Sequence, residues 1–487
     1  MQQKEVKKVK IFKLFINENI KTWKKFSTKL LIIAVLLSLI GVLGLAKFMQ
    51  HIEENSKNSV PVVDTSDEYL KSEIEYFKEQ LKNEDLDEQS RQSIQMQLEQ
   101  YELYLEYDIN LYGSTWKNEI VVKVVELRQN GQNDEAEKLI KMLKESDYSG
   151  YIETQKEILK TELTNKEIEQ QEYDDEMLIL ELKEKYEIGK NEEEDYWKTS
   201  IIREIQQSQK SVRNGINQNT RKVLKTEEKQ ELEDLIKIDI YRLEHNIEPA
   251  EYGAEENYRL MFEMLSPMFV IAVISIFAVI IAGGMISTEV SSGTIKFWAL
   301  TPNKRWKILT AKLLSILFYI IVITLVMSLL SVAFANIFFE EDGETYLYVK
   351  NGEVKEIGNT LYTVELYLAK AIPVVIFALF AVMLSTVTRN TAASVSFSMA
   401  LYMGNGIIMM IINQFIKNDW IRFVPFNNLN IADKIFNNST NIMQMATGGA
   451  GSFATSTSLG FSLAVLGVCV ILMIVTMYDS FNKRDII

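Results

Sequence analysis

Apolar residues gather in six long runs without a charged side chain, at residues 30–46, 264–287, 313–339, 371–388, 391–416 and 437–478. A helix needs about 20 mostly apolar residues to cross a hydrocarbon core about 30 Å thick. Each run supplies most of such a helix, and the last also has room for an outer segment. The pattern predicts six transmembrane helices, at residues 30–50, 261–286, 308–339, 368–387, 392–415 and 458–478.

The segment between the first two spans, residues 51–260, has the opposite character. It is rich in charged residues and nearly free of proline, and its apolar residues recur at helical spacing, as Leu70, Ile74 and Phe77 do. Because this insertion offsets the apolar runs, the mean hydropathy of the chain is only -0.02. We expect an all-α membrane protein with a large helical insertion, in which residues 151–188 form an extended helical hairpin or coiled-coil arm.

Lysine and arginine near the ends of the spans predict the orientation, because cytoplasmic loops carry an excess of both. Lysines crowd residues 1–29, and more cations follow in residues 287–307, 388–391 and 479–487. These segments lie on one side if six spans alternate. Both termini are then cytoplasmic, and residues 51–260, 340–367 and 416–457 are extracellular. The net charge of -14 does not set the side, since large domains translocate largely regardless of charge.

Several shorter segments also carry structural signals. Residues 1–29 alternate lysines with apolar residues, which fits either an amphipathic helix in the membrane interface or a basic flank that only orients the first span. Asn351-Gly352 is flanked by strand-forming alternation and predicts a β-hairpin. Residues 416–457 fit short re-entrant helices or an ordinary outer loop. Gly283-Gly284 predicts close helix packing near the inner end of the second span.

The chain has no sequence signature of an enzyme. It contains neither a Gly-x-x-x-x-Gly-Lys-Ser/Thr phosphate loop nor a Gly-x-Ser-x-Gly serine elbow. Its single cysteine, Cys469, has no partner for an intramolecular disulfide, and two histidines without a cysteine partner do not make a zinc site. We expect no catalytic residue, no metal site and no cofactor bound by this chain.

One polar residue stands out within the spans. Asn405 lies between Gly404 and Gly406 in the fifth span. It is a candidate for lining a translocation path, and the alternative is an interhelical hydrogen bond with close packing at the two glycines. Ionisable residues are absent from the span centres, which argues against an ion-coupled transporter built on buried carboxylates.

The loop between the second and third spans carries the most distinctive motif, formed by Glu289, Gly293, Thr294, Leu300, Pro302, Arg305 and Lys312. A helix-length stretch stops at Pro302, because proline cannot continue a helix and disfavours helical geometry in the residue before it. The spacing resembles that of the permease subunits of type-2 ABC exporters, whose loop reads Glu, a short gap, Gly-Thr, apolar residues, Pro-x-x-Arg and Lys. Six spans and a basic N-terminal stretch agree with the resemblance.

This resemblance covers roughly residues 8–50 and 262–484, and it implies that the loop forms a coupling helix received by a separate ATPase subunit. Ile295 and Trp298 would share one face of that helix. The residues expected to take part in coupling are Glu289, Gly293, Thr294, Ile295, Trp298, Leu300, Pro302, Arg305 and Lys312. An inert basic loop that only obeys the positive-inside rule is the alternative.

The expectations together describe the permease subunit of a bacterial ABC exporter in the plasma membrane. The partner ATPase would bind ATP and Mg²⁺. A second permease copy, identical or related, would complete the path. Membrane lipid would surround the path, and no nucleic acid would take part. Family analogy suggests a peptide, an antimicrobial or a lipid-like molecule as cargo. The competing hypothesis is a membrane-anchored extracellular sensor or immunity protein that binds a ligand without transport.

Overall fold

The computed structural model describes residues 11–56, 67–83, 86–113, 115–191, 196–218, 221, 223–224, 226–249, 258–296, 304–339, 345–350, 352–415, 419–436 and 457–483. The chain divides into two compact units. We call Asn58–Pro249 the insertion unit, and we call Met1–Lys57 together with Ala250–Ile487 the membrane unit. Each unit is described by itself.

Within its described residues, the membrane unit has six helices that are long and apolar enough to cross a membrane. They are α2 (Phe26–Ser56), α11 (Tyr258–Gly283), α14 (Arg305–Phe338), α15 (Asn359–Thr388), α16 (Thr391–Phe415) and α19 (Leu459–Lys483). The predicted all-α membrane fold with six spans is confirmed.

Helix α11 lies at the centre of the bundle, where it packs against α2, α14, α15 and α16. In the span that α11 forms, 67% of the residues are buried, whereas only 17% are buried in the α16 span and in the α19 span. Gly283 permits the close approach of α11 to α16, because a Cβ atom there would lie only 2.7 Å from a methyl carbon of Val395. The predicted close packing at this glycine pair is confirmed.

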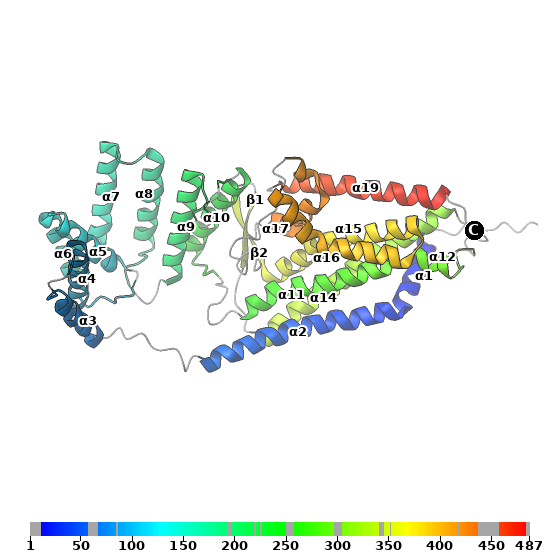
Figure 1. The fold of residues 1–487 in the computed structure, drawn as a ribbon, viewed down its shortest axis with the longest axis horizontal. Helices are drawn as coiled ribbons and strands as arrows, with labels where there is room; N and C mark the ends of the chain where they lie inside the picture. Colours follow the sequence, from blue (N-terminus) through cyan, green and yellow to red (C-terminus); the bar gives the residue numbers. More distant parts are fainter. Residues whose placement is uncertain are drawn as a thin grey trace, which may run out of the picture. The chain divides into compact units, whose positions relative to one another are not determined.

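The two ends of the membrane unit carry different elements (Figure 1). At one end lie α1 (Ile11–Lys24), α12 (Ser287–Ser291) and the C-terminal end of α19. At the opposite end lie the strands β1 (Thr345–Lys350) and β2 (Glu353–Gly358) and the short helices η1 (Asp419–Phe423), η2 (Pro425–Asn428) and α17 (Ile431–Phe436). Alternation of the six spans produces this separation of the loops.

The two strands form the hairpin that Asn351-Gly352 predicts. They are antiparallel with Lys350 opposite Glu353, which leaves two residues for the turn. Gly352 has a φ angle of 85°, in the left-handed region that such turns require. The ring of Tyr346 stacks on that of Tyr362 at a centroid distance of 4.0 Å and so holds the hairpin against α15.

The insertion unit is helical throughout its named elements, which are α3 (Asp67–Gln80), α4 (Glu88–Glu106), α5 (Trp116–Gln129), α6 (Asn133–Glu145), α7 (Tyr148–Asn165), α8 (Gln170–Lys185), α9 (Tyr196–Asn214) and α10 (Thr226–His245). Helices α7 and α8 form the predicted helical hairpin. One apolar core joins helices α3 through α7, and a second joins α8, α9 and α10. The hydroxyl of Tyr148 ties them together by hydrogen bonds of 2.9 Å to the carbonyls of Lys183 and Ile188.

Candidate functional site

The loop that carries the sequence motif begins as a short helix and then turns sharply. Helix α12 ends at Ser291, and Gly293 follows with a φ angle of 69°. The amide of Ile295 then donates to the carbonyl of Glu289 at 2.9 Å. No atom lies within 4 Å of the position of a Cβ on Gly293, so the glycine is required by its backbone conformation and not by a lack of space.

This turn corrects the expectation of one continuous helix through the motif. The described part is a five-residue helix, a left-handed glycine and the first residues after it, up to Lys296. Trp298, Leu300 and Pro302, which the sequence places in the coupling helix, lie outside the described residues. The hydroxyl of Thr294 donates to the Glu289 carbonyl at 3.3 Å, so this motif residue supports the turn.

The start of α12 is fixed to two neighbouring spans. The amides of Ile286 and Ser287 both donate to the hydroxyl oxygen of Ser385 in α15, at 3.3 and 3.0 Å. The hydroxyl of Ser287 lies 2.8 Å from that of Thr391, the first residue of α16. Because these atoms are buried or nearly so, the bonds hold the loop to the bundle at a defined place.

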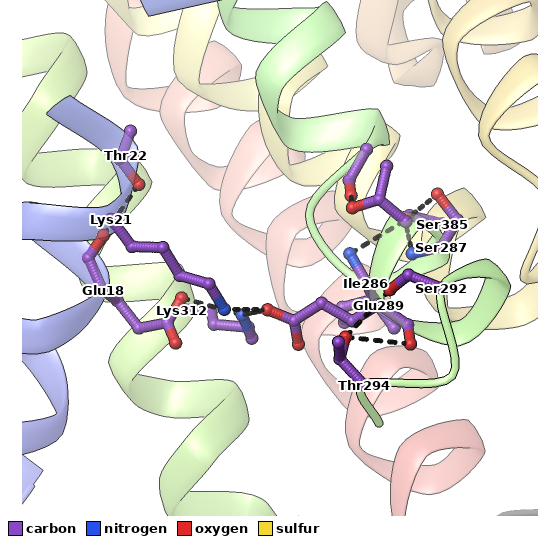
Figure 2. A network of polar contacts seen from close by, with 12 residues as sticks. Glu18, Lys21, Thr22, Ile286, Ser287, Glu289, Ser292, Thr294, Lys312 and Ser385 are labelled. Carbon is purple, nitrogen blue, oxygen red and sulfur yellow. Dashed lines mark hydrogen bonds and ion pairs between the residues drawn. The ribbon is translucent and has the colours of Figure 1, made fainter. Parts of the chain in front are cut away.

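Beyond this anchor, the loop meets a charge cluster, which we define as Glu18, Lys21, Glu289 and Lys312. The ammonium of Lys312 lies 2.9 Å from Oε1 of Glu289 and 2.8 Å from Oε2 of Glu18. The ammonium of Lys21 lies 2.5 Å from the same oxygen of Glu289. Figure 2 shows the two lysines converging on Glu289 from α1 and α14. The cluster therefore joins α1, α12 and α14.

Burial divides the members of the cluster into two kinds. The side chains of Lys312 and Glu289 are 1% and 10% exposed, whereas that of Lys21 is 53% exposed. A buried ammonium is tolerated when carboxylates compensate for its lost hydration, and Lys312 has two. Burial lowers the pKa of Lys21, but the hydrogen bond and the attraction of Glu289, with Glu18, outweigh it and raise that pKa. Burial and the repulsion of Lys312 lower the pKa of Lys25.

Two further motif residues also turn toward the interior of the chain. Ile295 is buried, and it lies with Arg305, Arg389 and Phe481 around one small crevice. A guanidinium nitrogen of Arg305 donates to the carbonyl of Asn482, just before the end of α19, at 3.3 Å. Ile295 and Lys312 thus hold the loop from the inner side, and the exposed residues of its described part include Thr288, Ser291, Ser292, Thr294, Lys296 and Lys304.

Asn405, the candidate for the translocation path, is half-buried in α16. Its side-chain amide donates to the carbonyl of Tyr402, one turn earlier in the same helix. This bond differs from the interhelical hydrogen bond that was the alternative. Its place in a path stays a prediction.

Glu18, Lys21 and Ser385 belong to the site although the motif does not include them. A signal for one of them exists in the sequence, since Glu18 is an acidic residue among the lysines of residues 1–29. Nothing in the sequence distinguishes Ser385 from the other hydroxyl residues of the spans. Among the described residues, no group of three or more His, Cys, Asp or Glu side chains is placed to hold a metal ion.

Comparison with known proteins gives a family. Residues 24–486 match the family model described as ABC-2 family transporter protein. The chain is 28% identical over 257 residues to the uncharacterized protein YhcI of Bacillus subtilis, which covers 52% of this chain and 76% of that protein. It is 26% identical over 208 residues to the uncharacterized membrane protein YdbK of the same organism, which covers 43% of this chain and 76% of that protein. No solved structure gives a significant match.

Proposed function

The chain belongs to the ABC-2 transporter family, and from this premise we propose that it is the permease subunit of an ATP-driven exporter. A separate ATPase subunit binds ATP and Mg²⁺, and two permease copies form the path. Both termini are cytoplasmic and the insertion unit is extracellular. The cargo is a peptide, an antimicrobial or a lipid-like molecule.

The observation that carries the coupling role is the double attachment of Glu289. Its backbone carbonyl accepts the hydrogen bond that closes the turn at Gly293. Its side chain is held by Lys312 of the α14 span and by Lys21 of α1. A displacement of the turn therefore displaces a charged group that two other helices hold. A loop of this construction supports the transmission of movement from an ATPase to the spans.

The ATPase would meet the outer surface of the loop. That surface includes the exposed Ser291, Thr294 and Lys296, together with Trp298, which lies outside the described residues. Ile295 and Lys312 support this surface from inside the chain and do not contact the ATPase directly. Arg305 fixes the start of α14 against the end of α19 and so sets where the loop ends.

A second permease copy would cover part of the apolar surface of the bundle. Helix α16 exposes an apolar face built from Phe397, Met403, Ile407, Ile411 and Phe415. Gly404 lies on the same face, and small residues allow helices of two copies to approach closely.

The test compares two loop variants in co-purification with the ATPase subunit and in ATP hydrolysis. An anchoring aromatic residue in an interface contributes about 2 kcal/mol or more, whereas a charge at the rim contributes less. Trp298→Glu should therefore reduce ATPase association far more than Lys296→Ala does. Membrane insertion should be unchanged, since neither residue lies in a span. Normal assembly and turnover of Trp298→Glu would show that the loop is not the coupling element.

One observation favours the second candidate function, a sensor that binds a ligand without transport. The insertion unit contains an open cleft of about 550 Å³, within the size range of ligand pockets. Trp116, Tyr148 and Tyr151 contribute to its floor, and Glu119 and Lys183 lie at its rim, joined by an ion pair of 2.8 Å. Ligand binding to a chain that never co-purifies with an ATPase would favour this function.

A further inference from the structure

Helix α1 has three distinct faces. One packs against α14, where Phe15 meets Phe318 at a ring distance of 5.5 Å and Trp23 meets Tyr319 at 5.3 Å. A second face is apolar and exposed, and it is built from Phe12, Ile16 and Ile20, at intervals of four residues. A third face is exposed and cationic, with Lys13, Lys21 and Lys24. It lies next to the apolar face around the helix axis.

This arrangement fits a helix that lies in the membrane interface. The apolar face enters the boundary of the acyl chains, while lysines beside it lie at the depth of the lipid phosphates. Each lysine near an anionic leaflet is attracted to it. The chemistry of the cationic face therefore selects a lipid with a net negative headgroup.

Lys21 differs from the other lysines of this face because it also belongs to the charge cluster. Its ammonium shares Oε1 of Glu289 with Lys312, while Oε2 of Glu289 accepts from no described residue. Lys312 is too deeply buried to reach a headgroup. Lys21 is half exposed, and an ion pair of an exposed lysine is weak enough for a nearby phosphate to compete with it. Lys21 is thus the exchangeable member of the cluster.

We propose that the phosphate of an anionic lipid binds Lys21 and Lys24 of α1 and takes Lys21 away from Glu289. Lys24 lies one turn from Lys21, so both ammonium groups reach one headgroup. Glu289 then keeps Lys312 as its remaining partner in the cluster, and the turn at Gly293 is held less firmly. The lipid composition of the inner leaflet thereby sets the mobility of the coupling loop. The consequence for transport rests on the proposed function, whereas the lipid site itself does not.

The experiment uses the full chain with Cys469→Ser and a spin label on Ser291→Cys, an exposed position in α12. Nanodiscs of phosphatidylcholine are compared with nanodiscs that contain increasing fractions of phosphatidylglycerol. We expect the spectrum of the otherwise unchanged chain to shift toward the mobile line shape as phosphatidylglycerol increases. Lys21→Gln should show the mobile line shape already in phosphatidylcholine and should not respond further.

Matched controls separate the exchange from a general effect of charge. Lys13→Gln lies on the same face but outside the cluster, so in phosphatidylcholine it should give the unsubstituted spectrum. Lys24→Gln should require more phosphatidylglycerol for the same shift. Inorganic phosphate added to phosphatidylcholine nanodiscs should leave the spectrum unchanged, which distinguishes lipid from free phosphate.

Two results would overturn the proposal. One is an unsubstituted chain whose spectrum is the same in both lipids, and the other is a Lys21→Gln variant that still responds to phosphatidylglycerol. The readout needs no ATPase, so its outcome is independent of the co-purification test of the proposed function. Failure of that test alongside a normal lipid response would leave the lipid site in place and remove the coupling role of the loop.

Discussion

Lys312 and Glu289 are 23 residues apart in sequence, and their charged groups meet at 2.9 Å inside the membrane unit. The sequence motif includes both residues. In the structure they bind each other, Lys312 also binds Glu18, and Glu289 also binds Lys21, so their immediate effect is to hold the loop against α14 and α1. Their part in the proposed coupling is therefore to position the loop.

The first prediction concerns Lys312→Met. Removing the ammonium leaves Glu18 and Glu289 without their buried cation, and breaking a buried ion pair in this way costs about 3–5 kcal/mol. Thermal unfolding in detergent, followed by fluorescence-detected size-exclusion chromatography, should show a large loss of stability. Lys355→Met is the control, since its pair with Glu353 is exposed and contributes at most about 1 kcal/mol. A loss no larger than that of the control would mean that the cluster does not hold the loop.

The second prediction concerns the left-handed backbone at Gly293. Alanine is strained there by roughly 1–2 kcal/mol, whereas asparagine tolerates this conformation. Open space around the position excludes a clash of the added Cβ atom. Gly293→Ala should therefore weaken ATPase association and hydrolysis, and Gly293→Asn should retain most of both. Equal loss in the two variants would point to crowding by the partner instead of backbone strain.

Much of the fold could be predicted from sequence because its signals are local. The six apolar runs, the Asn-Gly turn and the helical hairpin each depend on residues close together in the chain. Close helix packing at Gly283-Gly284 was also predicted correctly, because small residues in a span have few uses other than close packing. These predictions need only helix and turn geometry, together with the thickness of a membrane.

The interior of the site could not be predicted in the same way. A lysine at the start of a span has the same sequence signature whether it faces water or an internal carboxylate. Only the fold shows that Lys312 meets Glu18, which is 294 residues earlier. The orientation of Ile295 was likewise hidden, because the turn at Gly293 breaks the helical periodicity from which a docking face was inferred.

The third prediction tests orientation in intact cells. In a Cys469→Ser background, single cysteines at Asn130 and Lys350 should react with a thiol reagent that cannot cross membranes. Cysteines at Lys304 and Lys483 should react only after the membrane is opened. All four positions are exposed, so burial does not limit the reaction. Labelling of the cysteine at position 304 from outside would show that the loop does not lie on the side of the membrane where ATP is hydrolysed.

The fourth prediction is that residues 58–249 fold alone, because both apolar cores of the insertion unit are built within it. The isolated unit should give a helical circular dichroism spectrum and a cooperative melt. Tyr148→Phe should lower its stability by about 1–3 kcal/mol, since the carbonyls of Lys183 and Ile188 lose the hydroxyl proton that they share. Tyr76→Phe is the control, because the hydroxyl of Tyr76 only accepts one exposed hydrogen bond, from the side chain of Gln80, among the described residues. A unit that stays unfolded would require the membrane unit or a partner for its structure.

The last prediction concerns Asp239 in α10, a carboxyl group that is 3% exposed. Burial raises the pKa of Asp239 from 3.8 to about 8, the repulsion of Glu204 adds to this rise, and Arg242 opposes it. Between those two pKa values, the folded unit therefore keeps a proton on Asp239 that the unfolded chain has already released. Stability must fall as pH rises through that interval and level off above the folded pKa.

Asp239→Asn keeps the neutral form at every pH, so the difference in stability between this variant and the unsubstituted unit should grow as pH rises from about 4 to about 8. Denaturant unfolding of residues 58–249, measured across this range, gives that difference directly. Other titrating groups cancel in it, because they are present in both proteins. Asp134→Asn, at an exposed position in the first turn of α6, should show no such growth. A difference that stays constant with pH would mean that Asp239 is ionised in the folded unit. The attraction of Arg242 would then have to outweigh the cost of burying the Asp239 carboxylate.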